Sequence, residues 1–222
     1  MYTFDILDSL KGVMQTFALG VHRVLITDKR RSSKHARILT QTDVAMFLSE
    51  HIDDFGVNPD WTITQAGLYE EPGAGVLSMF STETALQGFN KLALNEVSAI
   101  AIIDQHGELV GTLSASDVRG VSDEDLADLG LPVMDYLMVL FCFCFYISSA
   151  DVSTQKRSRI FNHQVVVRSI TTVRSALLKM TDVHIHRVWV VDTNNRPRGV
   201  ISLSDLIHRF GSTTKSVKLR TL

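Results

Sequence analysis

The chain has 222 residues, of which 45% are hydrophobic and 21% charged, so it is a globular sequence long enough for one or two domains with a sizeable core. Its formal net charge of -2 at pH 7 creates no overall field that attracts nucleic acid, and we expect no nucleic-acid partner. The two cysteines, Cys142 and Cys144, are too few and too close for a disulfide framework. With no Asn-x-Ser/Thr site and no cleavable signal sequence at Met1, the sequence favours the cytoplasm, the nucleus or both.

The first pattern of regular structure occupies residues 1–53. A helix is predicted over residues 5–17, and the strand that should precede it is either missing or squeezed into residues 1–4. An apolar strand, a long hairpin turn and a closing helix over residues 42–51 follow. The turn carries a basic run that we interpret as a solvated loop rather than as a patch for phosphate or an acidic partner: Lys29, Arg30, Arg31, Lys34 and Arg37.

A linker over residues 54–74 leads to a second pattern over residues 75–130. A short strand at its start is followed by a helix over residues 82–94 and by two strands, 99–103 and 110–113, that form a hairpin. Ser116 is predicted to begin the closing helix of this segment.

Residues 131–163 form an atypical connection. Its longest uncharged apolar run, Tyr136 to Ala150, is shorter than the roughly 20 residues that cross a bilayer, so we expect it to be buried or covered by a partner rather than to enter a membrane. Cys142 and Cys144 could hold a soft metal, but core packing is favoured because no His or Cys cluster lies near them in sequence, and no metal is expected. The segment from Met138 to His163 is interpreted as an insertion peculiar to this chain, or as translated non-coding sequence.

The third pattern, over residues 164–211, is the clearest, and a basic tail over residues 212–222 follows it. Its first helix has apolar residues at helical spacing and can be capped by Thr171 or Thr172. Strands are predicted over 165–167, 188–191 and 199–202. We expect Ser204 to cap the closing helix and Gly211 to end it.

The three segments are repeats of one unit with the order strand, helix, strand, strand, helix, which indicates an α/β (α+β) fold built of tandem repeats. In each, a Ser/Thr-x-Ser/Thr-Asp sequence lies where the hairpin meets the closing helix, at residues 40–43, 114–117 and 202–205. Each unit has sheet on one side and helices on the other, so it must pair to cover its sheet. Three units leave one unpaired. Either a fourth unit has been lost before Met1, so that the first repeat is truncated, or another chain supplies the missing surface.

The recurring polar sequence indicates a ligand site. Hydroxyls and unpaired backbone amides at a helix start attract an anion, and the carboxylate can accept hydrogen bonds from the vicinal hydroxyls of a ribose. A Ser/Thr-Asp pair is also a common helix start that needs no ligand, but three copies at equivalent places favour the ligand. The candidate carboxylates are Asp43, Asp117 and Asp205, and the candidate hydroxyls are those of Thr40, Thr42, Ser114, Ser116, Ser202 and Ser204.

Two repeats carry a His-Arg pair just before the buried strand, His22-Arg23 and His186-Arg187. Arginine is the preferred fork for phosphate and histidine adds a further donor, so a shared phosphate role is predicted. The second repeat has Ser98-Ala99 at this point, and we therefore expect unequal sites.

The repeats resemble cystathionine-beta-synthase (CBS) domains, and more narrowly those of the gamma subunit of AMP-activated and sucrose-nonfermenting-type protein kinases. The residues that carry the resemblance are Ile185–Asp192 with Gly199–Leu206, Val97–Ala99, and Val21–Arg23 with Ile38–Thr40. That family pairs four repeats into Bateman-type modules, which form a disk that binds AMP, ADP or ATP. The resemblance implies that the three aspartates hold ribose, that the Thr40, Thr42, Ser202 and Ser204 hydroxyls line adenosine or phosphate, and that both His-Arg pairs reach phosphates.

No phosphate loop, kinase catalytic loop or paired Cys-x-x-Cys knuckle is present in the sequence, so no enzyme activity and no cofactor beyond an AMP, ADP or ATP ligand is expected. The resemblance implies a regulatory subunit that senses adenine nucleotide beside the catalytic alpha and beta-type subunits of a kinase, or that self-associates through its unpaired repeat. The alternative is a CBS scaffold that binds a partner chain or an S-adenosylmethionine-like ligand without sensing. A third and less favoured interpretation is a regulatory pair of CBS domains that belongs to a transporter or chloride channel.

Overall fold

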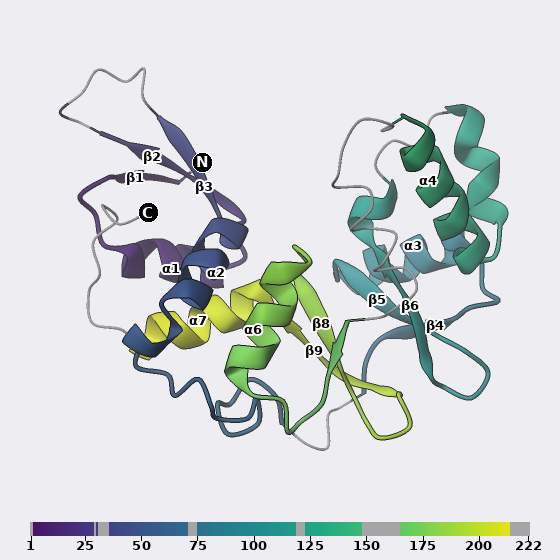
Figure 1. Cartoon of the computed structure of the whole chain (residues 1–222). Coiled ribbons are helices and arrows are strands. Elements are labelled where there is room, and N and C mark those ends of the chain that lie inside the picture. The colour runs from purple at the N-terminus through teal and green to yellow at the C-terminus, as the bar shows by residue number, and fades with distance from the viewer. Residues whose placement is uncertain are drawn as a thin grey trace. The chain divides into compact units, whose positions relative to one another are not determined.

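The computed structural model describes residues 2–28, 30, 36–70, 75–118, 123–147 and 165–213. They form three small sheets of three strands each, in the orders β1-β2-β3, β4-β5-β6 and β7-β8-β9 (Figure 1). In the first two sheets the opening strand runs parallel to the central strand, and the central strand pairs antiparallel with the third. This confirms a mixed fold of tandem repeats.

The first repeat contains its opening strand: Thr3 of β1 lies opposite Leu25 of β2. The following helix begins five residues later than expected, because Asp8 first closes a turn by accepting the Asp5 N–H at 2.7 Å, and Ser9 then caps the helix. The elements are β1 (Thr3–Asp5), α1 (Leu10–Ala18), β2 (Arg23–Thr27), β3 (Arg37–Thr40), α2 (Gln41–Glu50) and a 3-10 turn (Ile52–Asp54). Of the basic run, Lys29, Arg31 and Lys34 lie outside the described residues.

The second repeat departs from the expected order after its hairpin. Ser116 does not begin an α-helix but lies in a 3-10 turn, and the closing α-helix starts only at Val133, directly after Pro132. The intervening residues 123–130 include three aspartates and a glycine, which are poor helix formers. The elements are β4 (Ser78–Phe80), α3 (Ala85–Leu94), β5 (Ala99–Ile103), β6 (Leu109–Ser114), 3-10 segments (Ala115–Val118 and Asp123–Gly130) and α4 (Val133–Ile147).

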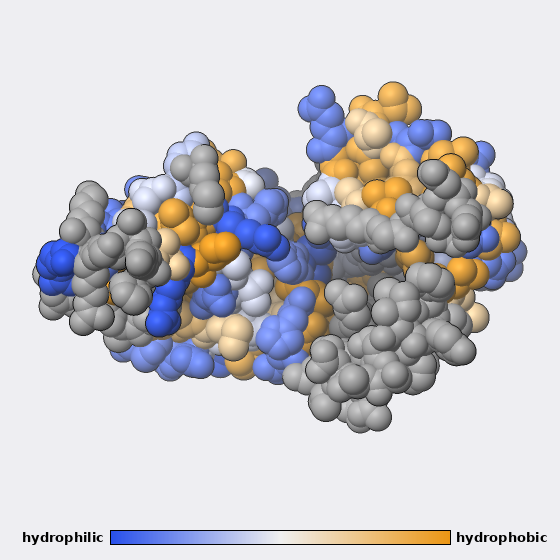
Figure 2. All heavy atoms as spheres, turned by 90° about the horizontal axis from the view of Figure 1, so that it is seen from above, coloured by the Kyte–Doolittle hydropathy of each residue, from blue (hydrophilic) through white to orange (hydrophobic). Residues whose placement is uncertain are grey.

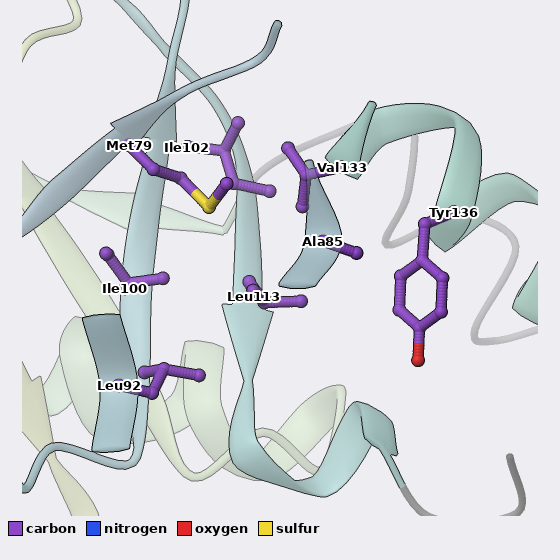
Figure 3. Packing of buried hydrophobic residues seen from close by; sticks show 8 residues of the cluster. All are labelled: Met79, Ala85, Leu92, Ile100, Ile102, Leu113, Val133 and Tyr136. Carbon is purple, nitrogen blue, oxygen red and sulfur yellow. The ribbon is translucent and has the colours of Figure 1, made fainter. Parts of the chain in front are cut away.

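Helix α4 is therefore the start of the connection predicted over residues 131–163, and it packs into the second repeat. Figure 3 shows Val133 and Tyr136 on α4 beside the apolar side chains of α3 and the sheet. Tyr136 contacts Phe89 edge to face, and its hydroxyl donates to the Asp117 carbonyl at 2.9 Å. Burial, reinforced by the negative charges of Asp117 and Asp128, raises the pKa of Tyr136 to about 12.

The apolar run that begins at Tyr136 is only partly buried where side chains are described. Tyr136 is buried, whereas Met138 and Val139 are exposed. Figure 2 shows apolar surface on this repeat. The side chains of Cys142 and Cys144, like residues 148–164, lie outside the described residues. No helix within the described parts of the chain is both long and apolar enough to span a membrane.

In the third repeat the first helix is capped by Thr172, whose side chain accepts the Ser175 N–H at 3.2 Å. The closing helix begins at Leu203, so Ser204 lies inside its first turn and does not cap it. The elements are β7 (Val166–Val167), α6 (Val173–Asp182), β8 (Arg187–Val191), β9 (Pro197–Ser202) and α7 (Leu203–Thr213). Most of the basic tail lies outside the described residues.

The helices of the first and third repeats pack together in one compact unit, made of residues 1–71, 167–188 and 200–222. Helix α1 lies against α7, and α2 lies against α6 and α7 (Figure 1). We had expected Gly211 to end α7, and this prediction is wrong. Gly211 lies within the helix, where a Cβ atom would stand 3.2 Å from the Cβ of Met14 on α1, so the glycine allows the close approach of the two helices.

The linker after the first repeat also belongs to this unit. Its backbone is tied to the start of α6: the Val173 N–H donates to the Trp61 carbonyl at 2.9 Å, and the Ile63 N–H donates to the Thr171 carbonyl at 2.8 Å. The first of these bonds satisfies a backbone N–H group that a helix start otherwise leaves unpaired.

The other compact unit consists of residues 72–166 and 189–199. Here the face of the second sheet that is turned away from α3 and α4 packs against Trp189 and Val191 of β8. The Trp189 indole donates to the Thr112 hydroxyl at 2.8 Å, so the ring is held by a hydrogen bond as well as by apolar contact.

The first helix of each repeat is followed by a residue in the left-handed backbone conformation. Gly20, Glu96 and His184 have φ values of 86°, 53° and 54°, and each follows the C-cap of α1, α3 or α6. After α6 the Ile185 N–H returns to the Met180 carbonyl at 3.0 Å, as in a Schellman motif. This conformation suits glycine and is strained for other residues, so His184 is held here by the backbone.

We expect His184→Gly to raise the free energy of unfolding by up to about 1 kcal/mol, because glycine removes the steric cost of the left-handed conformation. Denaturant unfolding of the folded chain measures this. The control is Asp182→Gly at the last residue of α6, which should lower stability by about 1 kcal/mol as glycine does within helices. A loss of stability in both variants would contradict the assignment of His184 to a strained position.

Candidate functional site

A backbone hydrogen bond forms the same corner in all three repeats. The donor is the backbone N–H of the residue directly after the third strand of the repeat. The acceptor is the backbone carbonyl of the residue at the histidine position of the His-Arg pair, or of Ser98 in the second repeat. The three bonds are Gln41 to His22 at 3.3 Å, Ala115 to Ser98 at 3.0 Å and Leu203 to His186 at 2.9 Å. The corner thus places the His-Arg position beside the start of the closing helix.

In the first and third repeats the aspartate of this corner is held by a capping arrangement. Asp43 Oδ2 accepts the Thr40 N–H at 2.8 Å and the Thr40 hydroxyl at 2.6 Å. Asp205 Oδ2 accepts the equivalent two bonds from Ser202, both at 2.7 Å. Thr40 and Ser202 therefore cap the two helices. Thr42 and Ser204, one residue before each aspartate, do not, because a capping residue lies three residues before its acidic partner.

This capping leaves half of each carboxylate for another partner. Every hydrogen bond that the described residues make to Asp43 and Asp205 goes to Oδ2, and both side chains are exposed. Oδ1 is therefore held in a fixed orientation and has no donor among the described residues. An oriented carboxylate oxygen at the surface is suited to accept hydroxyl groups of a ligand.

The corner of the second repeat is built differently and lies in the other compact unit. Asp117 Oδ2 accepts the Ser114 N–H at 2.7 Å, and the Ser114 and Ser116 hydroxyls lie 2.9 Å apart. A 3-10 turn replaces the α-helix here, so fewer aligned amides stand at the corner. Without a His-Arg pair, this corner has less positive charge than the other two.

The structure brings the corners of the first and third repeats together through Gln41. This side chain is 3% exposed, and its Nε2 donates to the Ser204 hydroxyl at 2.9 Å, while its Oε1 lies 3.1 Å from Nδ1 of His22. One amide group therefore contacts a site candidate from each repeat. The sequence reasoning missed Gln41, although a polar amide stands where the other repeats have Ala115 and Leu203.

Both His-Arg pairs lie in the same unit. His186 reaches the surface, but partial burial of its ring, the charge of Arg187 and the nearby His22 hold the pKa of His186 below its ordinary value. Arg23 is exposed and Arg187 half-buried, and Thr42 is half-buried in the first turn of α2. The unit thus combines two arginines and two histidines with the two oriented carboxylates. No group of His, Cys, Asp and Glu side chains within the described ranges is arranged to hold a metal ion.

Comparisons with known proteins agree with this repeat architecture. The sequence profile of the CBS domain matches residues 158–212. The chain is 24% identical to the SNF1-related protein kinase regulatory subunit gamma-like PV42a of Arabidopsis thaliana, over 96% of this chain and 64% of that protein. It is 23% identical to Protein SDS23 of Candida albicans, over 90% of this chain and 31% of that protein. The chain therefore spans less than two thirds of either relative.

A solved structure has the same fold at low sequence identity. An uncharacterized conserved protein from Pyrococcus horikoshii superposes with a TM-score of 0.60 at 17% identity, over 93% of this chain and 77% of that one. The chain therefore contains a match to the CBS domain over residues 158–212, its other two sheets repeat the same strand order and corner, and it resembles the gamma-like regulatory subunits of SNF1-related protein kinases.

Proposed function

We propose that this chain is a regulatory module that binds adenine nucleotide and senses AMP, ADP or ATP within a protein kinase complex. The observation that carries the proposal is the pair of corners in one unit, where Asp43 and Asp205 are held by their capping bonds with one carboxylate oxygen turned to solvent. A ribose offers two vicinal hydroxyls, and a carboxylate oxygen is the acceptor that such hydroxyls need.

The phosphate is assigned to the His-Arg pairs. Arg23 and Arg187 offer planar forks of donors, and His22 and His186 lie close enough for their charges to interact. The first turns of α2 and α7 add the positive end of a helix dipole. The ligand in this proposal is therefore an adenosine phosphate, with its ribose on the aspartates and its phosphates toward the histidines and arginines.

Regulation follows from linkage. If AMP and ATP compete for one corner and prefer different arrangements of the chain, their ratio shifts the population of those arrangements. The name of the Arabidopsis relative, a regulatory subunit of a SNF1-related kinase, supports kinase alpha and beta-type subunits as the partners that respond. The proposal assigns the chain no catalytic residue.

An alternative is a CBS scaffold that binds a partner chain or an S-adenosylmethionine-like ligand. The two His-Arg pairs of this unit favour phosphate, because S-adenosylmethionine carries a positive charge at its sulfonium and no phosphate. The second corner, which has no such pair, is where an adenosyl ligand without phosphate fits better.

Isothermal titration with AMP, ADP, ATP and S-adenosylmethionine tests the proposal directly. We expect adenylate to bind and Asp205→Ala to weaken it by about 1–3 kcal/mol, because the mutation removes a charged hydrogen-bond acceptor. Asp205→Asn separates this role from helix capping, because its amide oxygen can keep the bonds from Ser202 while its NH2 group replaces the acceptor that faces the ligand.

Both Asp205 variants should therefore lose affinity, while only the alanine variant should also lose stability, by about 1 kcal/mol for the lost cap. Asp43→Ala is the matched change in the first repeat. Unchanged adenylate affinity in all three variants would remove the aspartates from the site, and absence of binding by the folded chain would favour the scaffold.

Binding should also depend on pH. In the free protein the pKa of His186 is lowered, so its ring is neutral at pH 7, and a bound phosphate favours the protonated ring. Binding then takes up a proton, and the association constant for AMP should rise as pH falls from 8 to 6.5. We expect His186→Gln to flatten this dependence, and His208→Gln, at an exposed position on α7, to leave it unchanged. Equal slopes in all three proteins would place the phosphate elsewhere.

A further inference from the structure

The side chain of Gln41 is buried between two repeats and hydrogen-bonded on both ends. Its Nε2 lies 3.1 Å from the Val21 carbonyl and 3.3 Å from the Phe17 carbonyl, in addition to its contact with Ser204. Carbonyl oxygens only accept hydrogen bonds, so the NH2 group of the amide must face them. The orientation of the amide is thereby fixed, with Oε1 turned toward the ring of His22.

This orientation determines where the His22 ring carries its proton. Oε1 of Gln41 can only accept, so Nδ1 of His22 must be the protonated nitrogen of the neutral ring. The other ring nitrogen, Nε2, then carries no proton and lies on the side away from Gln41.

The same amide sets the role of the Ser204 hydroxyl. Ser204 Oγ accepts from Gln41 Nε2, and no described residue accepts the hydroxyl hydrogen. Its O–H is therefore available as a donor to a ligand atom. Leu203 occupies the position of Gln41 in the third repeat and cannot impose either effect there.

We infer that Gln41 is a positioning residue that makes the junction of the first and third repeats select phosphate-bearing ligands over the same ligands without phosphate. It orients the Ser204 hydroxyl as a donor that can serve a phosphate oxygen. The inference rests on the proposed nucleotide site and deepens it, because it names the side chain that sets phosphate selectivity without contacting the ligand itself.

The test compares AMP with adenosine in the wild-type chain and in Gln41→Leu, which copies the residue of the third repeat. We expect the ratio of the two affinities to fall by about tenfold in the variant, as for the loss of one charge-assisted hydrogen bond. Long-range 15N–1H NMR of the histidine rings reports the tautomer, and we expect His22 to change from the Nδ1–H form to a mixture that contains Nε2–H.

Ser204→Ala is the second variant, and it keeps the Gln41 amide and removes only the hydroxyl. It should lower the AMP to adenosine ratio and leave the His22 tautomer unchanged, so it tests the inference even if Gln41→Leu does not fold. An unchanged ratio in both variants, with AMP still bound, overturns the role of Gln41 alone. Failure of the wild-type chain to bind AMP overturns the proposed function as well, and the tautomer of His22 then shows whether the amide positions the ring.

Discussion

The apolar contact between the helices of the first and third repeats is the constraint on which the rest of the structure depends. Neither repeat can cover its helices alone, and α1 and α2 are buried only because α6 and α7 lie against them. Phe17 of α1 and Phe210 of α7 are both fully buried, on two helices that lie against each other. The polar corners at the starts of α2 and α7 then lie in the same unit, where the Gln41 side chain joins them.

A buried glutamine in such a contact is tolerated because all of its polar atoms are satisfied. Gln41 is 3% exposed, and leaving its amide unpaired would cost about 1–3 kcal/mol. Its four neighbours offset that cost, and two of them, His22 and Ser204, belong to different repeats. The amide thus connects two corners that come from distant parts of the sequence and breaks the symmetry between otherwise equivalent repeats, because the third repeat has Leu203 at the same place.

The sequence predicts the strands of this fold better than its helix starts. Runs such as Val188 to Val191 are apolar and β-branched, and they form the buried strands that this composition indicates. The cap of the closing helix in the third repeat was misplaced because two hydroxyls flank the same corner, and only the three-residue spacing to the aspartate decides between Ser202 and Ser204. The aspartates were recognisable as a repeated pattern. Gln41 was not, because its importance comes from a neighbour 163 residues away.

The unit that holds both corners is discontinuous in the chain. It takes residues 1–71 from one end and residues 167–188 and 200–222 from the other, while the second repeat lies between them in sequence. During synthesis the first repeat therefore emerges with its helices uncovered and must wait for the third, whereas β4, β5, β6, α3 and α4 can assemble from neighbouring residues. For that interval α1 and α2 expose apolar surface, so the speed of translation through the second repeat sets how long the nascent chain is vulnerable to aggregation.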